Sequence, residues 1–226
     1  MLRLLKSKLL NYTLVIYSFR HNKLFAYCNG VFFRDKNKLY ILTAEHAFSK
    51  IHPGDLQILF EGLLVSLEGE IIGNTAYDLV LFEIDQHLGL HLLEKYDFLE
   101  RDQLLFNYQP KENQTHLLIG YPSSKVTVRG LNIKEIPIIY QTSATADLSQ
   151  PNNIKFFYHK RKSKKPGQKG YVIAPDPVGL SGSGLWYIKL DHNNLEFKLV
   201  GIFKEFDRKK NLGTAIRVDY LREIIN

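Results

Sequence analysis

The stretch DPVGLSGSGLW, residues 176–186, is a glycine-rich turn that leads into an apolar strand. A turn of this composition is usually only a turn, because glycine and serine are common in tight reversals. Two further stretches have a polar residue where an apolar run meets a turn. TAEHAF (residues 43–48) holds His46 after such a run, and YDLVLFEI (residues 77–84) holds Asp78 before one. Each feature alone is typical of packing, capping or turn formation, but the three together indicate shared chemistry.

Nucleophilic acyl transfer needs this set of residue types. A serine hydroxyl is a weak nucleophile at neutral pH, so a neighbouring base must accept its proton. We predict that His46 is this base for Ser181, and that Asp78 accepts a hydrogen bond from the second ring nitrogen and stabilises the imidazolium. Because glycine lets the backbone turn inward, we expect the amides of Gly179 and Ser181 to bind the oxyanion of a tetrahedral intermediate.

The bulk composition is that of a globular protein. The 226 residues are 45% apolar and 23% charged, which is enough for one large domain or two small ones. Cys28 is the single cysteine, so no intrachain disulfide can form and we expect a cytoplasmic or otherwise reducing location. Residues 1–19 mix basic and apolar side chains, but polar residues interrupt the stretch. We therefore predict neither a signal segment nor a membrane span there, and expect a strand at residues 12–20.

The charge is concentrated in one place. The formal net charge is +7, and much of the excess lies in HKRKSKKPGQK, residues 159–169. This basic loop is either a solvated turn or a site for an acidic partner, and its lack of aromatic residues disfavours nucleic acid. His87 and His91 are four residues apart but lack the spacing of a zinc motif, and no nucleotide-binding fingerprint is present. We expect no metal and no cofactor.

Most of the chain consists of short apolar runs separated by turn residues, which predicts an all-β protein of antiparallel barrels or sandwiches. The predicted strands are residues 12–20, 23–33, 38–43, 56–60, 63–72, 78–84, 116–120, 126–128, 138–142, 154–158, 171–173, 184–190, 197–204 and 214–218. Helical turns are expected at residues 44–51 and 218–225, while residues 88–106 are ambiguous and lie where two β units would join.

The three core stretches together resemble the motifs of the trypsin/chymotrypsin-like serine proteases. TAEHAF is similar to T-A-A-H-C, YDLVLFEI to D-[IL]-A-L, and GLSGSG to G-D-S-G-G-P. Weaker similarities surround them: LVGIFK (199–204) resembles L-V-G-I-V-S, GTAIRV (213–218) resembles G-V-Y-A-R-V, and CNGVFF (28–33) resembles C-G-G-S-L-I. IGYPSSK (119–125) is similar to segments of disulfide-free bacterial members.

The resemblance implies two antiparallel β-barrels followed by a short C-terminal helix. The first barrel, residues 1–104, would carry His46 and Asp78, and the second, residues 105–226, would carry Ser181 and the oxyanion hole. It also implies a serine endopeptidase that acts on proteins or peptides through an acyl-enzyme. From the polar N-terminal stretch we expect no membrane association. The alternative is a catalytically weak or inactive module of the same fold that binds a partner through the inter-barrel cleft or the basic loop.

Several positions depart from the family pattern. Leu180 stands where the family has the Asp that pairs with a newly cut N-terminus, so we expect no activation step of that kind. Ala47 replaces the cysteine that would pair with Cys28. Ser183 falls at a usual glycine and is the second candidate nucleophile, although neither serine fits G-x-S-x-G and the chain order opposes an α/β-hydrolase. Lys204 stands where a serine often hydrogen-bonds the triad Asp, so that support is lost unless the alignment slips.

Substrate specificity is only weakly indicated. By position, the resemblance implies that Pro175 and its neighbours form the base of the pocket for the residue before the scissile bond. Lys204, Glu205 and Phe206 would form one wall. Asp176 would suggest a preference for basic residues, but pocket depth decides this and the sequence does not fix it.

Overall fold

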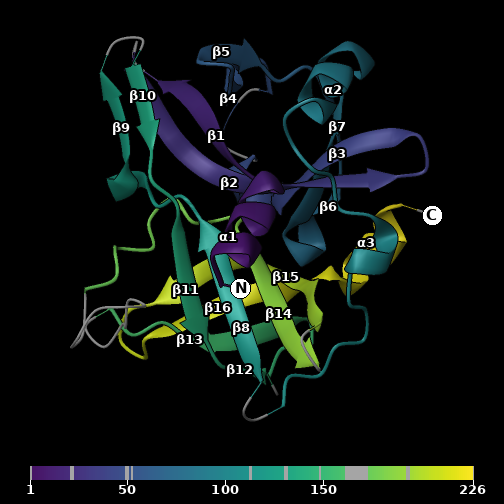
Figure 1. Ribbon diagram of the computed structural model, residues 1–226, viewed down its shortest axis with the longest axis vertical. Helices are drawn as coiled ribbons and strands as arrows, with labels where there is room; N and C mark the ends of the chain where they lie inside the picture. Colours follow the sequence, from purple (N-terminus) through teal and green to yellow (C-terminus); the bar gives the residue numbers. More distant parts are fainter. Residues whose placement is uncertain are drawn as a thin grey trace.

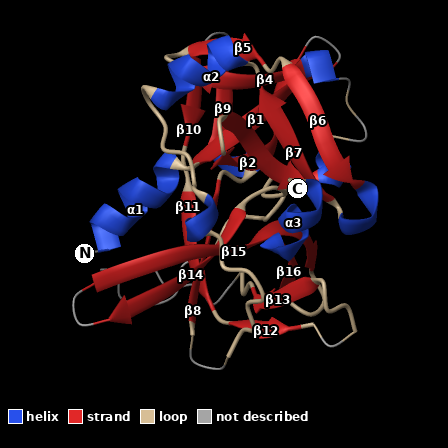
Figure 2. Ribbon diagram, turned by 90° about the vertical axis from the view of Figure 1, so that its right-hand side faces the viewer, coloured by secondary structure: helices blue, strands red, loops and turns tan. Residues whose placement is uncertain are grey.

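The computed structural model describes residues 2–20, 23–48, 51, 53–111, 114–129, 132–147, 149–160, 173–191 and 194–225. Within these residues the chain forms two curled antiparallel sheets of seven strands each and a separate two-stranded hairpin. The sheets lie one above the other, with the hairpin beside the first sheet (Figures 1 and 2).

The first sheet contains the strands from the N-terminal part of the chain, in the order β5-β4-β1-β2-β3-β7-β6. These strands are β1 (Thr13–Arg20), β2 (Lys23–Asp35), β3 (Lys38–Ala44), β4 (Leu56–Phe60), β5 (Leu63–Ser66), β6 (Gly69–Asn74) and β7 (Leu79–Ile84). The apolar residues of β3, β7 and the second half of β2 are almost all buried, as expected for central strands with both faces covered.

The second sheet has the order β11-β8-β14-β15-β16-β13-β12. Its strands are β8 (Thr115–Gly120), β11 (Ile138–Thr142), β12 (Ala144–Ala146), β13 (Asn153–Phe157), β14 (Gly184–Asp191), β15 (Asn194–Asp207) and β16 (Leu212–Arg217). The hairpin consists of β9 (Val126–Arg129) and β10 (Asn132–Glu135). Its end is attached to the first sheet by the Tyr17 hydroxyl, which donates to Glu135 Oε1 at 2.5 Å.

One hydrophobic core joins the two sheets. It contains Phe33 and Leu42 from the first sheet and Trp186 and Leu199 from the second. Helix α1 (Leu2–Asn11) packs into the same core through Leu5 and Leu9, which lie one helical turn apart and are both buried. The position of the sheets relative to one another is therefore fixed by apolar packing, and it determines which loop residues meet between them.

Two short helices complete the described chain. Helix α2 (Gln86–Leu93) is capped at its N-terminus by Asp85, whose carboxylate accepts hydrogen bonds from the amides of His87 and Leu88. Helix α3 (Leu221–Ile224) follows a single 3-10 turn at Val218–Tyr220 and buries Leu221. No helix in the described ranges is long and apolar enough to cross a membrane.

The all-β class and the helix after the last strand are confirmed. The seven strands β1–β7 lie before residue 105 and the second sheet lies after it, but the boundary between residues 104 and 105 stays a prediction. The single predicted strand at residues 63–72 is wrong. It is divided into β5 and β6, because residues 67 and 68 lie in neither strand and the two strands pair with different neighbours, β5 with β4 and β6 with β7.

Other expectations changed in detail. Helix α1 and the strands β10 and β12 were not predicted, and the expected helix at residues 44–51 is one 3-10 turn, Glu45–Ala47. The ambiguous segment 88–106 contains most of α2 and a 3-10 turn at Arg101–Gln103. Residues 161–172, which include most of the basic loop and two residues of the strand expected at 171–173, lie outside the described residues.

Candidate active site

His46 and Asp78 meet because β3 and β7 are antiparallel neighbours. Ala44, the last residue of β3, lies opposite Leu79, the first residue of β7, so the residue after β3 and the residue before β7 are adjacent. The Glu45 amide donates to the Asp78 carbonyl at 3.1 Å and closes this corner. Asp78 has a positive φ of 56°, which Asp tolerates better than most residues. The tight corner turns its carboxylate toward His46.

The imidazole and the carboxylate of this pair are in direct contact. His46 Nδ1 lies 2.9 Å from Asp78 Oδ1 and 3.0 Å from Oδ2, and the His46 backbone amide donates to Oδ1 at 2.8 Å. Asp78 is buried, whereas the imidazole is 42% exposed. The carboxylate therefore fixes the ring from behind and leaves Nε2 facing the open side.

Ser181 reaches this open side from the loop before β14. Its Oγ lies 3.1 Å from His46 Nε2 and 3.2 Å from the Lys204 carbonyl oxygen. The hydroxyl is half-buried and can donate to either acceptor. Ser183, the second candidate nucleophile, is fully buried. The fold thus brings together the three predicted side chains, His46, Asp78 and Ser181, and keeps Ser183 away from the surface.

Lys204 contacts Asp78. Its Nζ lies 3.3 Å from Asp78 Oδ2, so an ammonium group stands where the sequence had suggested lost support. Burial alone would raise the pKa of the Asp78 carboxyl, but the hydrogen bonds from His46 and the charges of His46 and Lys204 hold this pKa below its usual value. Asp78 is accordingly ionised at neutral pH, and Lys204 compensates part of its charge.

The loop before β14 presents two backbone amides in an orientation suited to an anion. The Val178 carbonyl accepts from the Ser123 amide at 2.9 Å, and the Leu180 carbonyl accepts from the Ser183 amide at 2.9 Å. In a trans peptide the N–H points away from the preceding carbonyl. The N–H groups of Gly179 and Ser181 therefore each point away from these bonded carbonyls, and neither donates a hydrogen bond to any other described residue.

Gly179 can occupy its position only as glycine. Its φ is +85°, and a Cβ there would lie 2.1 Å from Ser123 Oγ. We expect Gly179→Ala to lower kcat by about 10²- to 10³-fold, because the loop must shift and would move one of the two predicted oxyanion donors. Gly62→Ala is the matched control: Gly62 has φ +82° with nothing within 4 Å of a Cβ. If kcat falls equally in both variants, the effect is loss of fold stability and not of the oxyanion donor.

The predicted base of the specificity pocket is already engaged within the chain. The Pro175 carbonyl accepts from the Tyr158 hydroxyl at 2.8 Å. Asp176 lies 3.3 Å from both Lys160 Nζ and Arg208 Nη2. Burial alone would raise the pKa of Asp176, but these hydrogen bonds and charges hold it below its usual value. The Asp176 carboxylate is thus already paired with two cations of the chain, and a preference for basic substrate residues stays a prediction.

The predicted wall is partly filled by its own side chains. Phe206 makes an edge-to-face contact with Tyr158, with ring centroids 5.4 Å apart. Glu205 is exposed, and the Lys204 side chain turns back to the Asp78 carboxylate. Contact of these residues with substrate stays a prediction.

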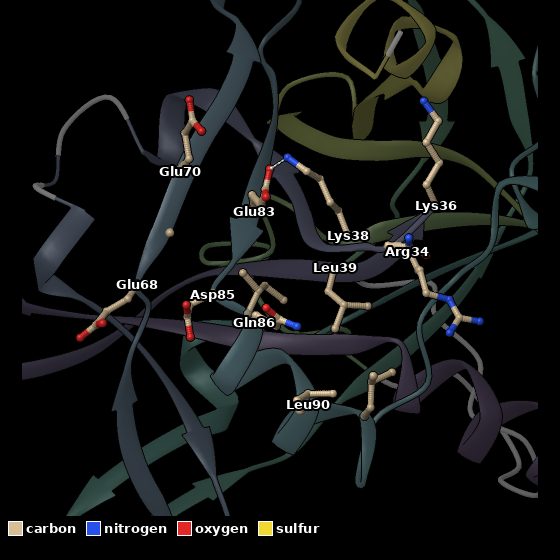
Figure 3. Close-up of a pocket in the computed structure, with 14 residues that line it drawn as sticks. Arg34, Lys36, Lys38, Leu39, Glu68, Glu70, Glu83, Asp85, Gln86 and Leu90 are labelled. Atoms are coloured by element: carbon tan, nitrogen blue, oxygen red, sulfur yellow. Dashed lines mark hydrogen bonds and ion pairs between the residues drawn. The ribbon is translucent and has the colours of Figure 1, made fainter.

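A separate hollow of about 710 Å³ lies on the first sheet beside β3, β7 and α2 (Figure 3). Acidic residues such as Glu68 and Glu70 and basic residues such as Arg34 and Lys36 line it, and the Lys38 ammonium pairs with Glu83 at 2.8 Å. None of the triad residues lines this hollow. Among the described residues no group of three or more His, Cys, Asp or Glu side chains could hold a metal ion.

No protein-family model and no curated protein sequence matches the chain. Solved structures do match it. The scabies mite inactivated protease paralogue is 14% identical with a TM-score of 0.58, and the match covers 96% of this chain and 95% of that one. A mutant of human heparin binding protein is 14% identical with a TM-score of 0.60, covering 95% and 89%. The serine protease domain of the Sesbania mosaic virus polyprotein is 13% identical with a TM-score of 0.55, covering 94% and 92%.

The chain has the chymotrypsin-like fold. The predicted resemblance is confirmed by matches that cover most of this chain and most of each matched chain. At these identities the likeness establishes the chymotrypsin-like architecture alone, and one matched protein is described as an inactivated protease. Catalysis by this member of the fold must therefore be argued from its own side chains.

Sequence reasoning missed two residues that shape the site. Asn29 lies on β2, and its side-chain amide donates to the Gly179 carbonyl at 2.5 Å. Ser123 holds the Val178 carbonyl through its backbone amide. Both were within quoted motifs, CNGVFF and IGYPSSK, but nothing in those motifs indicates a contact with a loop at residue 179.

Proposed function

We propose that this protein is a serine endopeptidase that hydrolyses peptide bonds through an acyl-enzyme on Ser181. The observation that carries this proposal is the 3.1 Å separation of Ser181 Oγ and His46 Nε2, with Asp78 bonded to the other ring nitrogen. This is the geometry in which a base can accept the hydroxyl proton.

The proposed reaction uses each group in turn. Ser181 Oγ attacks the scissile carbonyl carbon while its proton passes to His46 Nε2. The negative charge that forms on the carbonyl oxygen is stabilised by the amides of Gly179 and Ser181. His46 then gives its proton to the leaving amine, the C–N bond breaks, and an ester of Ser181 remains. A water molecule, deprotonated by His46, hydrolyses this ester and restores the serine.

The buried Leu180 supports an enzyme that needs no zymogen-type switch. Its side chain is fully buried in the same core as Tyr158, Val200 and Phe203. In this proposal the apolar packing of Leu180 holds the loop before β14 in its active conformation. An ion pair between an Asp at this position and a newly cut N-terminus is then not needed.

The test of this proposal is cleavage of a mixed peptide library. The wild type should generate new peptide termini at a restricted set of sequences, and His46→Ala should generate none above the rate of the blank. Discrete cleavage that persists in His46→Ala would contradict the proposal, because the proposed mechanism has no other base.

The ion pair between Lys204 and Asp78 leads to a prediction about the pH dependence of kcat/KM. Removing the Lys204 ammonium by Lys204→Ser takes away one of the charges that hold the pKa of Asp78 below its usual value. Because the proposed mechanism needs the ionised carboxylate, we expect the acid limb of the kcat/KM profile to move to higher pH. Lys155→Ser is the control, since Lys155 pairs with Asp147 at 3.4 Å in the second sheet. A profile that moves to lower pH, or equally in both variants, would contradict this assignment.

A second candidate is a binding module without efficient catalysis. The Lys204–Asp78 ion pair favours it, because the cation competes with His46 for the carboxylate charge. The matched scabies mite paralogue indicates that the fold persists when activity is lost. Absence of His46-dependent and Ser181-dependent cleavage of every library peptide would favour this candidate.

A further inference from the structure

Asn29 is a buried side chain that connects three segments. Its residue is fully buried in the middle of β2. The side-chain Oδ1 accepts from the Tyr121 amide at 2.7 Å, while Nδ2 donates to the Tyr121 carbonyl at 3.2 Å and to the Gly179 carbonyl at 2.5 Å. The side-chain amide of Asn29 thus pairs with the backbone of Tyr121, the residue after β8, as a neighbouring strand would. The second Nδ2 proton is directed at the loop that contains Ser181.

The backbone of Asn29 makes two further bonds. Its N–H donates to the Ser181 carbonyl at 2.7 Å, and its carbonyl accepts from the Thr43 hydroxyl at 2.7 Å. The space is closely filled, because a Cβ on Gly182 would lie 1.9 Å from the Asn29 carbonyl oxygen. One residue of the first sheet therefore contacts the loop of the second sheet through both its backbone and its side chain.

These bonds orient consecutive peptide groups of the loop. The carbonyls of Val178, Gly179, Leu180 and Ser181 accept, in that order, from the Ser123 amide, Asn29 Nδ2, the Ser183 amide and the Asn29 amide. The two donors proposed to bind the oxyanion lie on the first and third of these peptide groups. Asn29 holds the second and the fourth, so it restrains both neighbours of the Ser181 N–H.

We propose that Asn29 is a positioning residue for the oxyanion hole. Through Nδ2 it prevents the Gly179–Leu180 peptide from rotating, and it thereby keeps the Gly179 and Ser181 amides directed at the same point. This inference rests on the proposed function for its effect on rate, but the restraint on the loop is independent of whether the protein hydrolyses peptides.

The kinetic test compares Asn29→Ala with Asn153→Ala. Both wild-type side chains are buried, and each donates one bond of 2.5 Å, Asn29 to Gly179 and Asn153 to Gln150. We expect Asn29→Ala to lower kcat by up to about 100-fold with KM little changed, because the affected interaction is formed in the transition state. Affinity for a peptide aldehyde should fall in parallel with kcat/KM, whereas Asn153→Ala should leave both unchanged.

A near-isosteric variant separates positioning from simple loss of packing. Asn29→Asp keeps the acceptor for the Tyr121 amide but loses both donors, and it directs a carboxylate oxygen at the Gly179 carbonyl. We expect its kcat to be reduced at least as much as that of Asn29→Ala. Activity near the wild-type value in Asn29→Asp would overturn the inference, because the Nδ2 bond would then be dispensable.

A measurement that needs no activity keeps this inference separate from the proposed function. Hydrogen exchange of the bonded amides of Leu180, Gly182 and Ser183 should accelerate in Asn29→Ala and stay unchanged in Asn153→Ala. If the wild type proved inactive while this difference appeared, the restraint would stand and the protease proposal would fail. Equal exchange at these amides in the wild type and Asn29→Ala would overturn the inference.

Discussion

Replacing Ser181 with alanine is expected to lower kcat by about 10⁴- to 10⁶-fold, because the variant loses the atom that forms the acyl-enzyme. The expectation follows from the position of Ser181 Oγ, which is half-buried and lies 3.1 Å from His46 Nε2. Alanine fits the same backbone without strain, so the fold should be retained. Cleavage rates of the best library peptide, together with the thermal midpoint of unfolding, measure the two effects separately.

Ser183→Ala is the matched control for this variant. Ser183 lies two residues away in the same turn but is fully buried, with Oγ making no hydrogen bond to any other described residue. We expect Ser183→Ala to keep most of its activity, because a substrate carbonyl cannot reach this hydroxyl. Covalent labelling by a fluorophosphonate should follow the same pattern. Labelling that persists in Ser181→Ala and disappears in Ser183→Ala would transfer the nucleophile to Ser183.

Replacing Asp78 with asparagine is expected to lower kcat by about 10⁴-fold. The carboxylate accepts from His46 Nδ1 and from the His46 backbone amide, so it fixes the tautomer and stabilises the imidazolium. An asparagine can keep the shape but not the charge, and it also leaves the Lys204 ammonium without its partner. Binding of substrate, measured as KM, should change much less than kcat.

Asp147→Asn controls for the loss of a buried carboxylate. Asp147 is also buried and lies 3.4 Å from a lysine, but it is bonded to Ser149 and not to His46. We expect Asp147→Asn to keep its kcat. A comparable fall of kcat in both variants would attribute the effect of Asp78→Asn to destabilisation of the fold.

Asp78→Asn also has a predicted effect on the stability of the fold. The pKa of Asp78 lies below the unfolded value of 3.8, so the stability it contributes is fully present above that pH. This contribution is lost as pH falls through the lower, folded-state pKa. The difference in unfolding free energy between the wild type and Asp78→Asn should therefore be largest near neutral pH and disappear in strong acid.

The three side chains that meet in the candidate site could be predicted from the sequence, because each lies in a local motif. His46 follows a strand, Asp78 precedes one, and Ser181 lies in a glycine-rich turn, so their types and order could be recognised without knowing the fold. The antiparallel pairing of β3 and β7 then brings the first two together. Packing between the two sheets places Ser181 next to them.

The residues that tune the site could not be predicted in this way. The contact of Lys204 with Asp78 depends on the direction taken by a long, flexible side chain. The contact of Asn29 with Gly179 joins β2 to a loop position 150 residues further along the chain. Helix α1 was missed for a related reason, since its two buried leucines, Leu5 and Leu9, are too short a pattern to identify a helix without the core they enter.

The most direct test of the protease proposal is identification of the acyl-enzyme. The protein is mixed with a peptide ester built on its best library sequence, quenched in acid before turnover is complete, digested and examined by tandem mass spectrometry. We predict one acylated residue, Ser181, and no acylation in the His46→Ala variant. Acylation of Ser183, Lys204 or Cys28 instead of Ser181, or no acyl group at all during active turnover, would contradict the proposal.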